Sequence, residues 1–486
     1  MSIISNIKWV AIAELFKIAI QIANLLVITQ FVAPNEYGLM AIAMVVVNFG
    51  MLLKDQGISK AVIQKKTLSE ELKNAAFWFG LYLSLVIMLI TAFSSFKISE
   101  FYSEDKLVSV LLLISLIFPL NAISSIHTAI LERNSDFKLL SYIETISNII
   151  SFAIAILLAI YGYGVYSLVF QALTYSFLNS SLVIAKSKWN FSLKSAFKLK
   201  PIRELFKFSA NLFFFNLANY ASRNSDNILI GKFMSVSALG AYNLAYRIMQ
   251  FPLKSITFVV ARSLLPVLSK NQDDNQKIIN TYSNCVFSIL FLVLPGMLFL
   301  NLFAPTLIQL LLGDEWSLAG EVLSWLSICA IIQSVLSLSG SVFMSKGKTD
   351  QLLKLGLVGG TLHITGFLIG VNYDIITFSK IYLFTNTINA VVVLTFTAKL
   401  IGSNPIHIMR YCFNLFIVNF LVWAIYKILL NLDILENLEI NIFSITLLGT
   451  LYFITSFLLL LIFDKKIRDT SKKTYKKIQK KHLIKN

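Results

Sequence analysis

The sequence is poor in charged residues, cysteine and histidine. Only 14% of its 486 residues are charged, whereas a soluble domain carries about a quarter. Its three cysteines, Cys285, Cys329 and Cys412, lie in separate apolar segments, and its four histidines are scattered without metal-ligand spacing. We therefore predict inert packing cysteines and no metal site. Since a nucleophile elbow, a paired-carboxylate loop and a large extramembrane domain are also missing, we predict that the protein is not an enzyme.

Long apolar runs, by contrast, recur along the whole chain. Hydrophobic residues make up 57% of it, and its mean hydropathy is +0.74. A run of about 20 apolar residues is long enough to cross a bilayer as a helix. We predict an all-α integral membrane protein with fourteen spans, at roughly 10–32, 38–53, 75–96, 107–130, 139–160, 164–185, 206–230, 238–262, 279–302, 320–344, 352–371, 376–398, 411–430 and 440–463. The first is not read as a cleaved signal peptide, because Glu14 and Lys17 lie in its middle.

The net charge of +17 is distributed between the loops in a way that indicates topology rather than nucleic-acid binding. Lysine and arginine gather in alternate loops such as 54–73 and 186–207, and the intervening loops, such as 100–105, hold acids. This positive-inside pattern predicts cytoplasmic N- and C-termini. The basic tail 464–486 is read as a topology anchor on anionic lipid, with a partner-binding tail as the alternative.

A polar stripe occurs twice in the apolar background. The first copy is Glu14, Lys17, Gln21 and Asn24, and the same register 202 positions later is Asn216, Asn219, Arg223 and Asp226. The spacing i, i+3, i+7, i+10 places each set on one face of a helix. Because polar groups are costly inside a bilayer, the pair predicts two halves that face a shared wet cavity.

The 202-residue offset also pairs Gly38 with Gly240 and so extends beyond the stripe. Six spans per half is an even number, which predicts a parallel repeat about an axis along the membrane normal. The predicted parts are an N-terminal lobe at 1–185, a basic cytoplasmic linker at 186–207, a C-terminal lobe at 208–400, two extra helices at 401–463 and the tail at 464–486.

Several ionisable residues in predicted spans are candidates for the cavity. Arg247 is expected near mid-membrane, either as an anion-binding residue or as a structural partner of Asp226 or Glu14. Arg223 and Asp226 are three residues apart and could neutralise each other. Glu14, Asp226 and Glu144 are the candidate carboxylates for proton or sodium coupling, although Glu14 and Lys17 could instead form an internal pair.

Three short motifs carry a resemblance to a known family. They are the turn Pro34-Asn35-Glu36-Tyr37-Gly38, the stretch from Asp55-Gln56-Gly57 to Ala61-Val62-Ile63-Gln64, and Leu312-Gly313-Asp314-Glu315-Trp316. Together they resemble the Wzx-type polysaccharide flippases of the multidrug/oligosaccharidyl-lipid/polysaccharide (MOP) exporter superfamily. The resemblance implies two six-helix lobes around a central cationic cavity, to which Arg223 and Arg247 are suited and Lys17 less so.

The resemblance also implies a function. It is the movement of undecaprenyl-diphosphate-linked oligosaccharide from the inner to the outer leaflet of the bacterial plasma membrane, for O-antigen, capsule or exopolysaccharide synthesis. We expect alternating access, no cofactor beyond H⁺ or Na⁺ coupling, and membrane lipids and polysaccharide assembly proteins as partners, without nucleic acid.

Three alternatives remain open from the sequence. A MATE-like small-molecule exporter of the same fold predicts an anionic cavity. A membrane polysaccharide polymerase or ligase predicts a large outer loop, whereas the longest outer segment expected here is only about 303–319. A scaffold for envelope glycosyltransferases would tolerate cavity substitutions.

Overall fold

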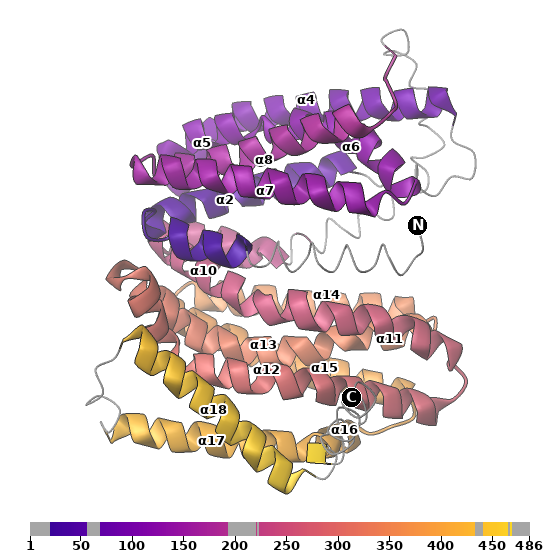
Figure 1. Cartoon of the computed structure of the whole chain (residues 1–486), viewed down its shortest axis with the longest axis vertical. Coiled ribbons are helices and arrows are strands. Elements are labelled where there is room, and N and C mark those ends of the chain that lie inside the picture. Colours follow the sequence, from indigo (N-terminus) through magenta and orange to yellow (C-terminus); the bar gives the residue numbers. More distant parts are fainter. Residues whose placement is uncertain are drawn as a thin grey trace, which may run out of the picture. The chain divides into compact units, whose positions relative to one another are not determined.

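The computed structural model describes residues 20–55, 69–192, 220, 223–432, 441–464 and 467–468. Within these ranges the chain forms helices joined by turns, and no strand (Figure 1). Contacts divide the chain into two compact units, Met1–Ala241 and Tyr242–Asn486. The boundary falls inside the helix α10, so that the residues before Tyr242 belong to the first unit.

The first unit contains six labelled helices before α10. They are α2 (Pro34–Asp55), α4 (Glu70–Tyr102), α5 (Lys106–Ile114), α6 (Ile117–Arg133), α7 (Phe137–Ile160) and α8 (Val165–Lys186). A break at Ser115 and Leu116 separates α5 from α6, which otherwise form one continuous span. Pro119 explains the break, because proline has no N–H to donate and its ring clashes with the carbonyl four residues earlier, that of Ser115.

The second unit carries the rest of α10 and the helices that follow. They are α10 (Val236–Pro252), the π-helical turn η3 (Leu253–Thr257), α11 (Phe258–Lys270), α12 (Asn275–Leu312), the 3₁₀ turn η4 (Asp314–Trp316), α13 (Ser317–Ser345), α14 (Thr349–Gly370), α15 (Ile375–Leu400), α16 (Pro405–Tyr411), α17 (Phe413–Asn431) and α18 (Ile442–Phe463). The π-helical turn directly follows Pro252, where the missing N–H interrupts the regular ladder.

Among the described residues, eleven helices are long and apolar enough to cross a membrane. They match the predicted spans two to six and nine to fourteen one for one. The eighth predicted span, 238–262, is the α10–η3–α11 segment, whereas the first falls partly and the seventh largely outside the described residues. The protein is therefore an all-α, multi-pass membrane protein, as predicted.

Parts of α4 and α7 bury small residues and expose large ones, as expected of helices that face lipid. On α4, Ser84, Thr91, Ser95 and Ser99 are buried, whereas Phe93 is 77% exposed. On α7, the buried face after Ile143 likewise carries serines and alanines, whereas Ile149 and Leu157 are exposed. Because lipid tails are as apolar as leucine, tight contact between small side chains holds such helices together.

Candidate functional site

The structure describes part of the duplicated stripe. Glu14, Lys17, Asn216 and Asn219 lie outside the described residues. In the first copy, Gln21 is exposed and Asn24 is half-buried. In the second copy, Arg223 is exposed and Asp226 is only 2% exposed. The two neighbouring charges of the second copy therefore differ in environment, although they are three residues apart.

The helical segment that carries Arg223 and Asp226 packs against α2 and α4 within the first unit. Tyr220 donates its hydroxyl hydrogen to the Val45 carbonyl of α2, and its ring lies 5.8 Å from that of Phe49. Further along, Lys232 donates to the Phe101 carbonyl at 2.6 Å, at the end of α4. These contacts orient the segment so that the Asp226 side chain is buried, and its Oδ1 accepts the Asn227 N–H at 2.7 Å.

Arg247 lies on the uncovered side of α10, in the second unit. The opposite face of this helix is buried through Tyr242, Ala245 and Met249, each at 0% exposure, and Tyr242 packs edge-on against Phe378 of α15 at 5.8 Å. Arg247 itself is exposed. An exposed arginine is costly in lipid, so the position favours contact with water.

The third candidate carboxylate lies apart from these groups along the chain. Glu144 is exposed on the second turn of α7, and its carbonyl accepts a hydrogen bond from Asn148 at 2.8 Å. The structure therefore shows whether each of four candidates is exposed or buried: Arg223, Asp226, Arg247 and Glu144. Their assignment to a common cavity stays a prediction.

Glu36 joins three helix starts in the first unit. Its carboxylate accepts from Lys106 Nζ of α5 at 2.6 Å and from the backbone N–H of Val165, the first residue of α8, at 2.7 Å. Gly164 has φ +53°, and a Cβ there would lie 2.9 Å from the Glu36 carboxylate. A carboxylate at a helix N-terminus is stabilised by the unpaired N–H groups and the helix dipole. The sequence showed Glu36 as part of a motif, but not this role.

The two glycines paired by the repeat meet through a reciprocal contact within the first unit. A Cβ on Gly38 would lie 1.9 Å from the Val236 carbonyl oxygen, and one on Gly240 would lie 1.9 Å from the Pro34 carbonyl oxygen. Val236 is the counterpart of Pro34 at the 202-residue offset. A self-complementary contact of this kind is what a local two-fold relation between the first turns of α2 and α10 produces.

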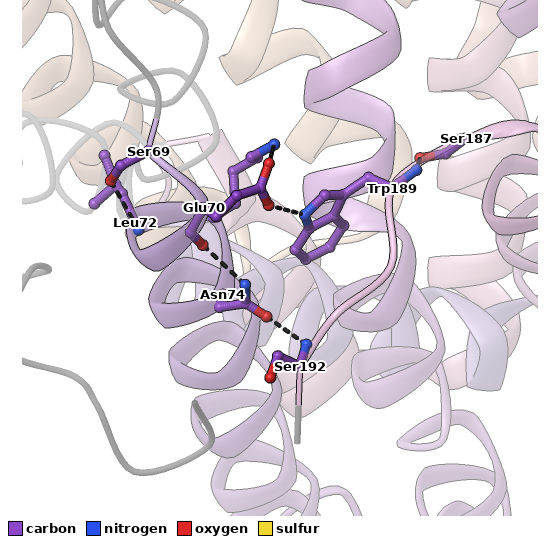
Figure 2. A network of polar contacts seen from close by, with 8 residues as sticks. Ser69, Glu70, Leu72, Asn74, Ser187, Trp189 and Ser192 are labelled. Atoms are coloured by element: carbon purple, nitrogen blue, oxygen red, sulfur yellow. Dashed lines mark hydrogen bonds and ion pairs between the residues drawn. The ribbon is translucent and has the colours of Figure 1, made fainter. Parts of the chain in front are cut away.

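The chain that follows α8 is hydrogen-bonded to the start of α4 (Figure 2) and to α6. Trp189 Nε1 donates to Glu70 at 2.9 Å, and the Ser192 N–H donates to Asn74 at 2.5 Å. The Ser187 hydroxyl lies 2.9 Å from Nδ1 of the buried His127. We call residues 187–192 the strap. It fixes the start of the predicted linker 186–207 to the first unit. No sequence motif predicts these contacts between distant residues.

A family profile described as polysaccharide biosynthesis protein matches residues 27–321, more than half of the chain. The chain belongs to this family. The matched range includes Glu36, Gly38, the strap and Gly240, so the contacts above lie in the part that the polysaccharide biosynthesis profile covers.

Within the polysaccharide biosynthesis family, named relatives cover most of the chain. It is 26% identical to the teichuronic acid biosynthesis protein TuaB of Bacillus subtilis (strain 168), over 72% of each chain. It is 24% identical to the lipopolysaccharide biosynthesis protein WzxC of Escherichia coli (strain K12), over 76% of this chain and 75% of that one. Its fold is similar to that of the lipid II flippase MurJ, with a TM-score of 0.76, 16% identity and coverage of 94% of this chain and 98% of that one.

Proposed function

We propose that this protein is a flippase for lipid-linked oligosaccharide in surface polysaccharide synthesis, working by alternating access. Membership of the polysaccharide biosynthesis family supports the pathway class, and the fold shared with a lipid II flippase supports the type of transport. It moves the sugar from the inner to the outer leaflet of the bacterial plasma membrane, with both termini in the cytoplasm.

The observation that carries the substrate class is the pair of arginines on helices of an apolar fold. Arg223 and Arg247 are each exposed, whereas Asp226 and the Tyr242, Ala245 and Met249 face of α10 are buried. Arginine presents a planar fork of donors that matches phosphate oxygens. A diphosphate-linked polyprenol places its anionic group at the membrane surface and its hydrocarbon chain among the lipid tails. We assign the diphosphate to these guanidinium groups, with Lys17 as a further cation.

The energy source follows from the same assignment. Movement of a charged, sugar-bearing lipid in one direction needs a driving force, and an H⁺ or Na⁺ gradient supplies one. Among the three carboxylates, Asp226 is the first to test for such a role, because it is 2% exposed whereas Glu144 is exposed. Glu144 and Glu14 are the other two groups to test.

The experiment is a flipping assay with purified protein in liposomes. The probe is undecaprenyl diphosphate carrying a fluorescently labelled monosaccharide, and a membrane-impermeant reductant destroys the fluorescence of probe in the outer leaflet. We expect the double variant Arg223→Ala/Arg247→Ala to flip at least a hundredfold more slowly, because each lost charge-assisted hydrogen bond is worth about 1.5–3 kcal/mol, or about tenfold to a hundredfold in rate.

Two controls make the result specific. Arg410→Ala removes an exposed arginine of α16 outside the proposed site and should leave flipping unchanged. Arg223→Lys/Arg247→Lys keeps the charges without the fork and should give an intermediate rate. Wild-type flipping by the double alanine variant would refute anion recognition by these residues. A wild-type protein that moves cationic dyes but not the lipid probe would instead indicate a small-molecule exporter.

A further inference from the structure

A cluster of neutral polar side chains joins three apolar helices of the second unit. Gln333 of α13 donates from Nε2 to the Tyr382 hydroxyl at 2.9 Å and to Asn386 Oδ1 at 3.0 Å, both on α15. Asn386 is 1% exposed and Tyr382 is 6% exposed. Asn386 uses its own Nδ2 to donate to the Tyr382 carbonyl at 2.8 Å. The donors and acceptors of this cluster are therefore fixed in direction.

His363 of α14 joins the cluster through a bond whose direction can be worked out. Its Nδ1 lies 3.0 Å from Thr385 Oγ1, and Thr385 Oγ1 donates to the Tyr382 carbonyl, also at 3.0 Å. A threonine hydroxyl has one hydrogen to donate. The approach of Thr385 Oγ1 to the Tyr382 carbonyl assigns its hydrogen to that carbonyl, and on this assignment Thr385 accepts from His363 and the imidazole carries its proton on Nδ1. The Nε2 lone pair is then the free basic site of the ring.

The approach of α14 to α15 holds this geometry. A Cβ on Gly366 would lie 2.5 Å from Thr385 Cγ2, so glycine at this position lets the threonine stand directly beside the histidine. The imidazole is half-buried, which leaves room at its edge. The hydrogen bond at Nδ1 thus orients the ring and sets its tautomer, as the partner of the second nitrogen commonly does in functional histidines.

Aromatic rings also surround the imidazole. Phe367 stacks on it with ring centroids 6.2 Å apart, and Tyr382 meets it edge-on at 5.4 Å. A cation beside the face of an aromatic ring is stabilised by the ring quadrupole. Tyr382 lies within the range of about 6 Å for a cation–π contact, and Phe367 lies just outside it. The rings therefore offset part of the cost of a charged imidazole, which burial otherwise disfavours.

The charged side chains on the described helices around His363 do not contact its ring. They either contact another residue or lie near helix ends. On its own helix, Asp350 and Lys354 lie in the first two turns. On α15, Tyr382 is the titratable group in contact, Lys380 is directed onto the Trp325 ring at 5.0 Å, and Lys399 is in the last turn. On α13, Glu321 lies in the second turn and Cys329 is buried. A proton on Nε2 would thus place a new charge in an uncharged cluster.

We propose that Nε2 of His363 is the proton-binding site that couples transport to a proton gradient. This inference rests on the proposed transport function and assigns its coupling ion. A proton adds to the Nε2 lone pair and no other bond is broken. The imidazolium strengthens the Nδ1–H bond to Thr385 and favours arrangements of α14 and α15 in which water reaches Nε2. Release of the proton to the opposite side restores the neutral cluster.

The first test measures the proton itself. Protein labelled with ¹⁵N-histidine is titrated in lipid nanodiscs by NMR, and the signal absent from His363→Asn identifies the residue among the four histidines. We expect the Nδ1–H tautomer at high pH and conversion to the doubly protonated ring as the pH falls. A ring that stays neutral wherever the protein remains folded would overturn the proposal. Thr385→Val keeps the histidine and removes its acceptor, so the tautomer preference should be lost.

The second test measures coupling in liposomes with the labelled undecaprenyl-diphosphate probe. We expect an imposed proton gradient to accelerate the wild-type protein at least fivefold and His363→Asn not at all, while downhill flipping persists. His407→Asn, on the exposed surface of α16, should respond as wild type. Equal acceleration of His363→Asn would overturn the coupling role. A protein that does not flip the probe refutes the transport function, whereas the NMR titration still decides the proton site.

Discussion

Removal of the Glu36 carboxylate is the sharpest test of how the first unit is held together. Glu36→Ala breaks the bond to the Val165 N–H at 2.7 Å and the ion pair with Lys106 at 2.6 Å. Hydrogen bonds to a charged group contribute about 1.5–3 kcal/mol. The ion pair adds about 0–1 kcal/mol, because the Lys106 side chain is 57% exposed and water screens it. We expect a loss of about 1.5–4 kcal/mol.

Matched variants separate the two bonds. Glu36→Gln keeps an oxygen that can accept from Val165 and should lose about half as much. Lys106→Met removes the ion pair alone and should cost about 1 kcal/mol or less. Gly164→Ala forces a Cβ to within 2.9 Å of the carboxylate at φ +53°, and its effect should be smaller in a Glu36→Ala background, since the residues are in contact.

The assay is thermal unfolding of purified protein in detergent, followed by the loss of the helical signal in far-UV circular dichroism. For a unit of this size, about 1 kcal/mol corresponds to a shift of about 2–4 °C. We therefore expect Glu36→Ala to lower Tm by several degrees more than Lys106→Met. If the two variants were equally stable, the bond from Glu36 to the start of α8 would have no part in stability.

Three further predictions concern the strap, the glycine contact and a helix cap. Trp189→Ala removes the bond to Glu70 and should speed tryptic cleavage after Lys188 several-fold, whereas Asn190→Ala, at an exposed strap position, should not. Gly38→Ala and Gly240→Ala should each lower Tm and flipping by similar amounts, because both Cβ atoms meet a backbone carbonyl; Gly80→Ala, with nothing within 4 Å, should lose neither. Asp374 caps α15, and hydrogen bonds from the Thr377 hydroxyl and the Thr377 and Ile376 N–H groups lower its pKa. Its contribution is therefore complete above about pH 4 and lost as pH falls through the lowered pKa. Asp374→Ala should cost about 0.5–2 kcal/mol at neutral pH, and Asp374→Asn should make this part of the Tm profile independent of pH; an unchanged acid profile would contradict this.

The spans were predictable because hydropathy is a local property of the chain. Each of the eleven spans found among the described residues coincides with a predicted one, and prolines account for the interruptions at Ser115 and after Pro252. The pairing of Gly38 with Gly240 was also visible, since a repeat preserves register. The cavity residues remain predictions, because four of them lie outside the described residues and exposure alone does not show what the others face.

Contacts between distant residues were the part that the sequence did not reveal. Glu36 stood in a recognisable motif, yet its partners are 70 and 129 residues away. The role of His363 could not be predicted, because no ligand spacing surrounds it in its own segment. Its partner Thr385 is on the next helix, 22 residues on.

By itself, the sequence determined that this chain is a helical membrane protein with an internal repeat, because hydropathy, loop charge and register are read along a single chain. Only the tertiary structure decided which polar groups meet. Hydrogen bonds act over about 3 Å, and helix packing alone brings Glu36 to the start of α8, the two glycines into reciprocal contact, and His363 to the threonine that fixes its tautomer.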